Sequence, residues 1–187
     1  MSQQELLIIV ISGLEEKNIP YMLTGSLVSS IQGEPRLTHD IDLIINLDKK
    51  DSDKILSLFT SDKYYISEKA LKESLNKKTS FNVIDLETGD KVDFWILSKS
   101  SFDLSRFSRR IKIKFLDFFI YISTPEDTIL EKLFWSKISG GSEKHFKDAM
   151  HVFEFQREKL DFVYLEMWVE KLKIEDLWKK IRDIYNL

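Results

Sequence analysis

The 187 residues, 43% of them hydrophobic and 12% aromatic, form a chain long enough to bury a core and too apolar to remain disordered. The absence of cysteine excludes disulfides, thiolate metal sites and cysteine nucleophiles, and three histidines argue against a histidine-rich zinc site. A formal net charge of -3 argues against binding nucleic acid through overall charge. No apolar run reaches the roughly 18 residues of a membrane span, and the start of the chain lacks the basic region of a signal peptide. We therefore expect a cytoplasmic protein without a membrane partner.

Apolar spacing and turn residues predict helices that alternate with strands over the first part of the chain. The expected elements are a helix over 3–17, a strand over 21–24, a helix over about 27–32, a strand over 38–47, a helix over 48–60, a short strand over 64–66 and a helix capped by Ser67.

A second group of strands is followed by helices only. The pattern predicts strands over 81–86 and 91–97, a helical turn over about 102–107, and a hairpin of 111–115 and 118–122. Thr124 and Pro125 mark a helix start, and helices are then expected over about 126–138, 143–155, 162–171 and 175–185. The sequence thus predicts an α/β (α+β) fold, with a mixed β-sheet core in residues 1–123 and a helical C-terminal subdomain in 124–187 packed on it.

Three aspartates in apolar strands are the main candidates for chemistry. Asp40 and Asp42 are two residues apart, so on a strand their side chains share one face. Ionised carboxylates are costly to hold together unless a cation lies between them. Asp93, in a later strand that is otherwise apolar, is a third candidate ligand. Because hard divalent ions prefer carboxylate oxygens, the three aspartates predict a metal site that holds a phosphate.

A Gly25–Ser26 turn precedes the strand with the aspartate pair. Gly25 permits a tight turn, and Ser26 can cap the helix that follows. Backbone amides at a helix N-terminus suit the phosphates of a nucleoside triphosphate. The turn is therefore a candidate nucleotide-binding element.

Each of these features also has a purely structural interpretation. An Asp-x-Asp pair alone is common in solvated turns and strand edges, and the structural alternatives for Asp93 are a position at a strand edge or a pairing with Lys91. Lys132 lies among apolar residues of a predicted helix, where a lysine more often extends to solvent than binds phosphate. A basic cluster is interpreted as a solvated hairpin surface in preference to an RNA contact, and consists of Arg106, Arg109, Arg110, Lys112 and Lys114.

The combination of these motifs resembles the DNA polymerase beta-type nucleotidyltransferase superfamily. The resemblance lies in Thr24-Gly25-Ser26, in Arg36-Leu-Thr-His-Asp40-Ile-Asp42-Leu-Ile-Ile and in Lys91-Val-Asp93-Phe, and it covers about residues 20–150. Within that superfamily the chain resembles the minimal bacterial branch that includes the type IV, abortive-infection toxins of toxin–antitoxin systems. There, a Pro-Glu-Asp helix opening, an inward lysine and a later Lys-Asp pair recur, here Pro125-Glu126-Asp127, Lys132 and Lys147-Asp148.

The resemblance implies a transferase that depends on Mg²⁺ (or Mn²⁺) and moves a nucleoside monophosphate from a triphosphate to an acceptor hydroxyl. It implies that Asp40, Asp42 and Asp93 are catalytic and hold metal, with Asp93 helping to activate the acceptor. Gly25, Ser26 and Lys132 are then the nucleotide-binding residues. It favours a tRNA end or a protein as acceptor and allows a cognate antitoxin. The alternatives are an aminoglycoside-type small-molecule nucleotidyltransferase and a catalytically silent binding protein or antitoxin.

Overall fold

The computed structural model describes residues 2–60 and 62–186 of the chain. The chain forms two compact units, which we call the sheet unit and the helical unit. The sheet unit consists of the residues before Gly25 together with Leu37–Ile122. The helical unit consists of Gly25–Arg36 and the residues after Ile122. The chain therefore passes from one unit to the other three times.

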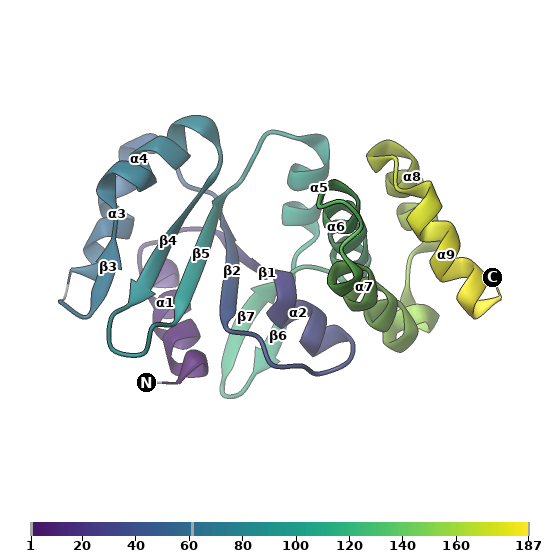
Figure 1. Cartoon of the computed structure of the whole chain (residues 1–187). Helices are drawn as coiled ribbons and strands as arrows, with labels where there is room; N and C mark the ends of the chain where they lie inside the picture. Colours follow the sequence, from purple (N-terminus) through teal and green to yellow (C-terminus); the bar gives the residue numbers. More distant parts are fainter. Residues whose placement is uncertain (1, 61, 187) are drawn as a thin grey trace. The chain divides into compact units, whose positions relative to one another are not determined.

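The sheet unit is built on a mixed sheet whose strand order, among the described residues, is β3-β4-β5-β2-β1-β7-β6 (Figure 1). The pairs β2–β5 and β1–β7 are parallel, and the remaining neighbours are antiparallel. The strands are β1 (Tyr21–Thr24), β2 (Asp40–Ile45), β3 (Tyr64–Ile66), β4 (Ser80–Asp85), β5 (Lys91–Ile96), β6 (Ile111–Phe115) and β7 (Phe118–Ile122).

The two central strands β2 and β5 bury one face completely. Their buried residues alternate along each strand and comprise Ile41, Leu43, Ile45, Val92, Phe94 and Ile96. On this face Phe94 stacks on Phe81 with ring centroids 5.0 Å apart and contacts the edge of Phe59 at 6.1 Å. Further apolar side chains come from α1 (Gln3–Glu16), which passes behind the sheet in Figure 1, and from α3 (Ser52–Leu56) and α4 (Glu68–Lys77).

The opposite face of these strands is apolar at one end and charged at the other. At the apolar end Met22 and Ile44 form a cluster with Phe107 of α5 (Ser101–Arg109), and Trp95 packs against this cluster. Toward the start of β2 and β5 the same face carries charged residues, which are described below. This uneven cover leaves polar groups at the sheet surface, where water or a ligand can reach them.

The helical unit packs around α6. Its helices are α2 (Gly25–Gln32), α6 (Pro125–Ile138), α7 (Glu143–Gln156), α8 (Phe162–Leu172) and α9 (Glu175–Tyr185). Helix α6 is buried over most of its length, and Phe153 of α7 contacts the rings of Trp178 and Tyr185 at 5.5 and 5.2 Å. A Cβ on Gly33 would lie 2.8 Å from the backbone nitrogen of Val152, so only glycine allows this close approach to α7.

The structure confirms the predicted α/β fold class, and most elements lie where the pattern predicted them. The helix predicted over 48–60 is instead divided into η1 (Lys49–Asp51), α3 and η2 (Ser57–Phe59). The side chain of Leu58 in η2 approaches Gly13 of α1 so closely that a Cβ on Gly13 would lie 2.9 Å from it. We attribute the tight turns, in place of a continuous helix, to this tertiary contact. Residues 25–36 group with the helices and not with the sheet. The division into domains at residue 124 stays a prediction.

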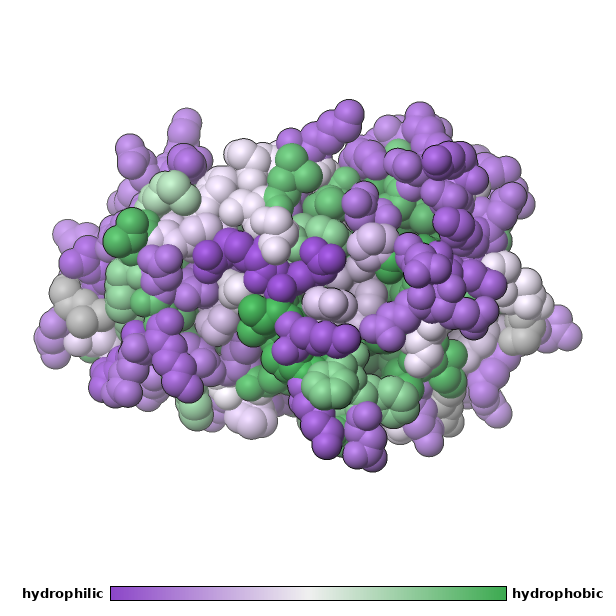
Figure 2. Space-filling model, turned by 180° about the vertical axis from the view of Figure 1, so that it is seen from behind, coloured by the Kyte–Doolittle hydropathy of each residue, from purple (hydrophilic) through white to green (hydrophobic). Residues whose placement is uncertain are grey.

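Within the described residues, no helix is both long enough and apolar enough to cross a membrane. The space-filling view from behind shows separate apolar patches bordered by polar side chains (Figure 2). One lies toward the bottom of the view, the direction in which the β6–β7 hairpin points in Figure 1. The exposed apolar residues of that hairpin include Leu116, Phe118 and Phe119.

Candidate active site

The three predicted aspartates stand on the partly covered face of the sheet. Asp42 and Asp93 are direct register partners across the parallel β2–β5 pair, so their side chains emerge next to each other. Asp40 precedes Asp42 by two positions and shares its face. Asp42 is half-buried, whereas the side chains of Asp93 and Asp40 are 21% and 55% exposed. The sheet thus gathers three carboxylates at a surface that solvent reaches.

Lys91 lies among these carboxylates. It is the register partner of Asp40 on β5 and shares a face with Asp93. Its Nζ is 2.8 Å from Asp93 Oδ2 and 3.8 Å from Asp40 Oδ1. The hydrogen bond to Asp93 raises the pKa of Lys91 above its ordinary value, so the ammonium group stays charged at neutral pH. The pairing that the sequence offered as an alternative for Asp93 is therefore present.

Asp42 has a different partner. The indole Nε1 of Trp95, two residues beyond Asp93 on β5, donates to Asp42 Oδ1 over 3.4 Å. Trp95 is itself part of the apolar packing at the other end of this face. The packed indole therefore restrains one oxygen of the half-buried carboxylate.

The donor set fits a divalent ion in its chemistry, since three carboxylates from two adjacent strands supply oxygen ligands. Among residues 2–60 and 62–186, however, no three histidine, cysteine, aspartate or glutamate side chains are already grouped to hold a metal. The contacts explain this, because Lys91 holds Asp93 and Trp95 holds Asp42. A metal ion could be held here only if these side chains turned toward one another.

In the helical unit, the Gly25–Ser26 turn opens α2. Gly25 is its first residue and has a φ of +72°, in the left-handed region that favours glycine. The Ser26 carbonyl oxygen accepts hydrogen bonds from the hydroxyls of Ser29 and Ser30, each at 3.0 Å. Ser26 lies within α2, and its hydroxyl contacts two cationic side chains.

These cations are Arg36 and Lys132, and both are held by Asp148 of α7. Arg36 donates from Nε to Asp148 Oδ1 at 2.9 Å and from Nη2 to Oδ2 at 2.8 Å, a two-pronged pair. Lys132 Nζ donates to the same Oδ2 at 2.9 Å. Ser26 Oγ accepts from Arg36 Nη2 at 2.8 Å and from Lys132 Nζ at 3.4 Å. We call these four residues the Ser26–Asp148 network.

The network carries an excess of positive charge. Burial would raise the pKa of Asp148, but the hydrogen bonds from Arg36 and Lys132 outweigh it and hold that pKa below its usual range. Two cations therefore surround one carboxylate and one hydroxyl. Burial and the charge of Lys132 lower the pKa of nearby His145, which adds no charge at neutral pH. The network can accept an anion such as a phosphate.

Two members of the Ser26–Asp148 network, Arg36 and Asp148, were not identified as site residues from the sequence. Arg36 stands 112 positions from Asp148, a pairing that no local pattern reveals. One available signal was that Arg36 is the only arginine before Arg106, in a stretch where the other cations are lysines. Trp95 was also missed, because its apolar neighbours suggested packing alone.

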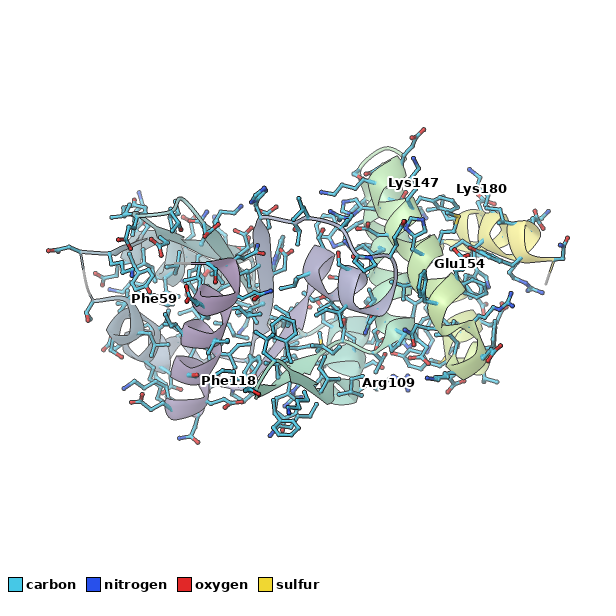
Figure 3. The ribbon with its side chains drawn as sticks, turned by 90° about the horizontal axis from the view of Figure 1, so that it is seen from below. Phe59, Arg109, Phe118, Lys147, Glu154 and Lys180 are labelled. Atoms are coloured by element: carbon cyan, nitrogen blue, oxygen red, sulfur yellow. The ribbon has the colours of Figure 1, made fainter. Side chains whose placement is uncertain are left out.

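Other residues singled out from the sequence have structural surroundings. In the Pro125-Glu126-Asp127 opening, Asp127 is buried and accepts from the hydroxyls of Thr124 and Tyr164 at 2.8 and 2.6 Å. Lys147 is exposed on α7 (Figure 3). The predicted basic cluster includes Arg109 of α5, which is labelled in the lower part of the molecule in Figure 3, as is Phe118 of the β6–β7 hairpin. In that hairpin Lys112 Nζ lies 5.6 Å from the ring centroid of Phe119.

No protein-family model and no curated protein matches the sequence. Several solved structures have a fold similar to that of this chain. The complex of ANT(2'')-Ia with adenylyl-2''-tobramycin superposes with a TM-score of 0.57 at 12% identity, covering 99% of each chain. Lincomycin-bound LnuA, a lincosamide antibiotic adenylyltransferase, gives 0.55 at 13% identity over 81% of this chain and 96% of its own. A nucleotidyltransferase-like protein from Paracoccidioides brasiliensis gives 0.58 at 18% identity, over 95% and 91%. The chain therefore has the fold of the nucleotidyltransferases.

Proposed function

We propose that the protein is a metal-dependent nucleotidyltransferase that moves a nucleoside monophosphate from a triphosphate to an acceptor hydroxyl. The observation that carries this proposal is the placement of Asp40, Asp42 and Asp93 on one face of adjacent parallel strands. The nucleotidyltransferase fold supports it. Carboxylates on one face favour a nearby cation, and a divalent ion is a cation that also binds phosphate.

In the proposed reaction the acceptor oxygen attacks the α-phosphorus, and the bond from that phosphorus to the β-phosphate bridging oxygen breaks. Pyrophosphate leaves with the bonding electron pair. In this scheme Asp93 would accept the hydroxyl proton, and Asp40, Asp42 and Asp93 would hold the metal. When bound, Mg²⁺ or Mn²⁺ supplies electrostatic stabilisation of the phosphoryl oxygens and of the attacking oxygen.

The amides of Gly25 and Ser26 at the start of α2, together with Lys132, are the proposed ligands of the triphosphate. Arg36 joins them because it shares Ser26 and Asp148 with Lys132. Asp148 is a positioning residue in this scheme, since it holds both cations through hydrogen bonds.

Two acceptor classes remain as candidates. The sequence resemblance to toxin nucleotidyltransferases favours a tRNA end or a protein, with a possible antitoxin as partner. The fold likeness to ANT(2'')-Ia and LnuA over nearly their whole lengths favours a small hydroxylated molecule of the antibiotic type. The two candidates share the same transfer chemistry and differ only in the nucleophile.

The test is transfer of label from each α-labelled nucleoside triphosphate, with Mg²⁺ or Mn²⁺, to separate acceptor pools. The pools are bacterial tRNA, bacterial protein, and a panel of aminoglycosides and lincosamides. We expect one pool to be labelled by the wild-type protein and not by Asp40→Asn/Asp42→Asn. The control is Asp53→Asn, which changes an exposed carboxylate of α3 and should leave the transfer unchanged.

Label transfer that survives the double substitution in a folded protein would show that these aspartates do not hold the catalytic metal. Nucleotide binding without transfer to any pool would instead support the silent binding protein.

A further inference from the structure

The cation that lies among the three aspartates in this structure belongs to the chain itself. Lys91 Nζ reaches Asp93 Oδ2 at 2.8 Å, a hydrogen-bonded ion pair, and Asp40 Oδ1 at 3.8 Å. The contact follows from the strand geometry, because Lys91 is beside Asp40 on the neighbouring strand and two residues before Asp93 on its own. A single ammonium group thus bridges carboxylates from both strands.

A divalent ion and this ammonium group require the same oxygens. An ion that binds Asp93 and Asp40 would lie close to the present position of Nζ, where two positive charges repel each other. The lysine side chain is long, and Lys91 is 37% exposed, so Nζ has room to leave toward solvent. Displacing it is possible but works against metal binding.

We propose that Lys91 is a built-in counter-ion that competes with the divalent metal for Asp93 and Asp40. In the absence of metal it offsets part of the negative charge of Asp93 and Asp40 and occupies the oxygens that a metal would need. A metal ion binds only after Nζ has released Asp93, so the free protein has a low metal affinity. Because Mg²⁺ retains waters and binds readily through substrate phosphates, the ion then arrives together with the nucleotide. This inference rests on the metal site of the proposed function.

A lysine that only stabilises the sheet would behave differently. If the ion pair served stability alone, removing the ammonium group would weaken the protein without improving metal binding. If Lys91 instead helped to hold the metal site in shape, its removal would weaken metal binding. Of these three roles, only competition predicts that metal binding becomes tighter when the lysine is removed.

The experiment measures Mn²⁺ binding to the full chain by titration calorimetry, without nucleotide and without an activity readout. For Lys91→Met we expect a Kd lower by about 30-fold, the effect of one unit charge at about 4 Å from a divalent ion in a largely aqueous setting. Lys91→Arg keeps the charge and should bind as weakly as the wild type. Lys112→Met, which removes a strand lysine of the β6–β7 hairpin, is the matched control and should also leave the Kd unchanged.

Asp93→Asn separates this inference from the proposed function. If Asp93→Asn abolishes Mn²⁺ binding and Lys91→Met leaves it unchanged or weaker, the metal site stands and the competition is refuted. If the double variant Lys91→Met/Asp93→Asn binds Mn²⁺ with the same Kd as Lys91→Met, the proposed metal site itself is refuted. Thermal unfolding followed by circular dichroism shows that each variant is folded before its Kd is compared.

Discussion

Asp148 holds two cations, and its replacement by asparagine should destabilise the helical unit more than the loss of either cation. The Asp148 and Lys132 side chains are 6% and 3% exposed, so Asp148→Asn leaves a buried ammonium group without its counter-charge. Breaking a buried pair in this way costs about 3–5 kcal/mol. Lys132→Met should cost less, because Asp148 keeps its two hydrogen bonds from Arg36.

Urea unfolding followed by tryptophan fluorescence measures these differences, since Trp135, Trp168 and Trp178 belong to the helical unit. Removing both buried charges in Lys132→Met/Asp148→Asn should restore part of the stability that Asp148→Asn loses. The exposed pair Glu73–Lys77 provides the control, and Glu73→Gln should leave unfolding unchanged. Equal destabilisation by Lys132→Met and Asp148→Asn, with no recovery in the double variant, would refute the shared-carboxylate explanation.

Three further outcomes follow from the same contacts. Because folding lowers the pKa of Asp148, the ionised carboxylate stabilises the protein fully above its unfolded pKa of about 3.9, and this stabilisation is lost as pH falls further. Urea midpoints measured between pH 5 and 2.5 should therefore fall less steeply for Asp148→Asn than for the wild type. Gly25→Ala, at a φ of +72°, should cost about 1–2 kcal/mol by the same unfolding assay, and an unchanged midpoint would contradict the assigned backbone conformation. Mn²⁺ should change the fluorescence of Trp95, whose indole donates to Asp42, and Trp95→Phe should remove that change; a signal that persists in Trp95→Phe comes from elsewhere.

Local pattern was sufficient to predict the central strands. Apolar residues alternate with Asp40 and Asp42 on β2 and with Asp93 on β5, so their shared face could be expected before the pairing was known. The β6–β7 hairpin was also predictable, because Leu116-Asp117 separates a run that alternates Ile with Lys from an apolar run. The structure has the turn at these residues, with Leu116 at a φ of +53°.

Contacts between distant segments were not predictable in the same way. The parallel pairing of β2 with β5 and the 112-residue separation of Arg36 from Asp148 depend on tertiary folding, which local periodicity does not encode. The grouping of α2 with the C-terminal helices has the same origin, since Gly33 fits against the backbone of α7. From the sequence, Lys91 could be seen only as a possible partner of Asp93. The proposed competition between Lys91 and a metal also involves Asp40, and that contact depends on the pairing of β2 with β5.

The central claim is that Asp93 takes part in metal-dependent nucleotidyl transfer. Its most direct test is the initial rate of label transfer from an α-labelled triphosphate to the acceptor pool that the wild-type protein labels. We predict that Asp93→Asn lowers this rate by at least about 100-fold, the contribution of a general base, while Asp117→Asn at the hairpin tip leaves it unchanged. A folded Asp93→Asn protein that transfers label at the wild-type rate would contradict the account.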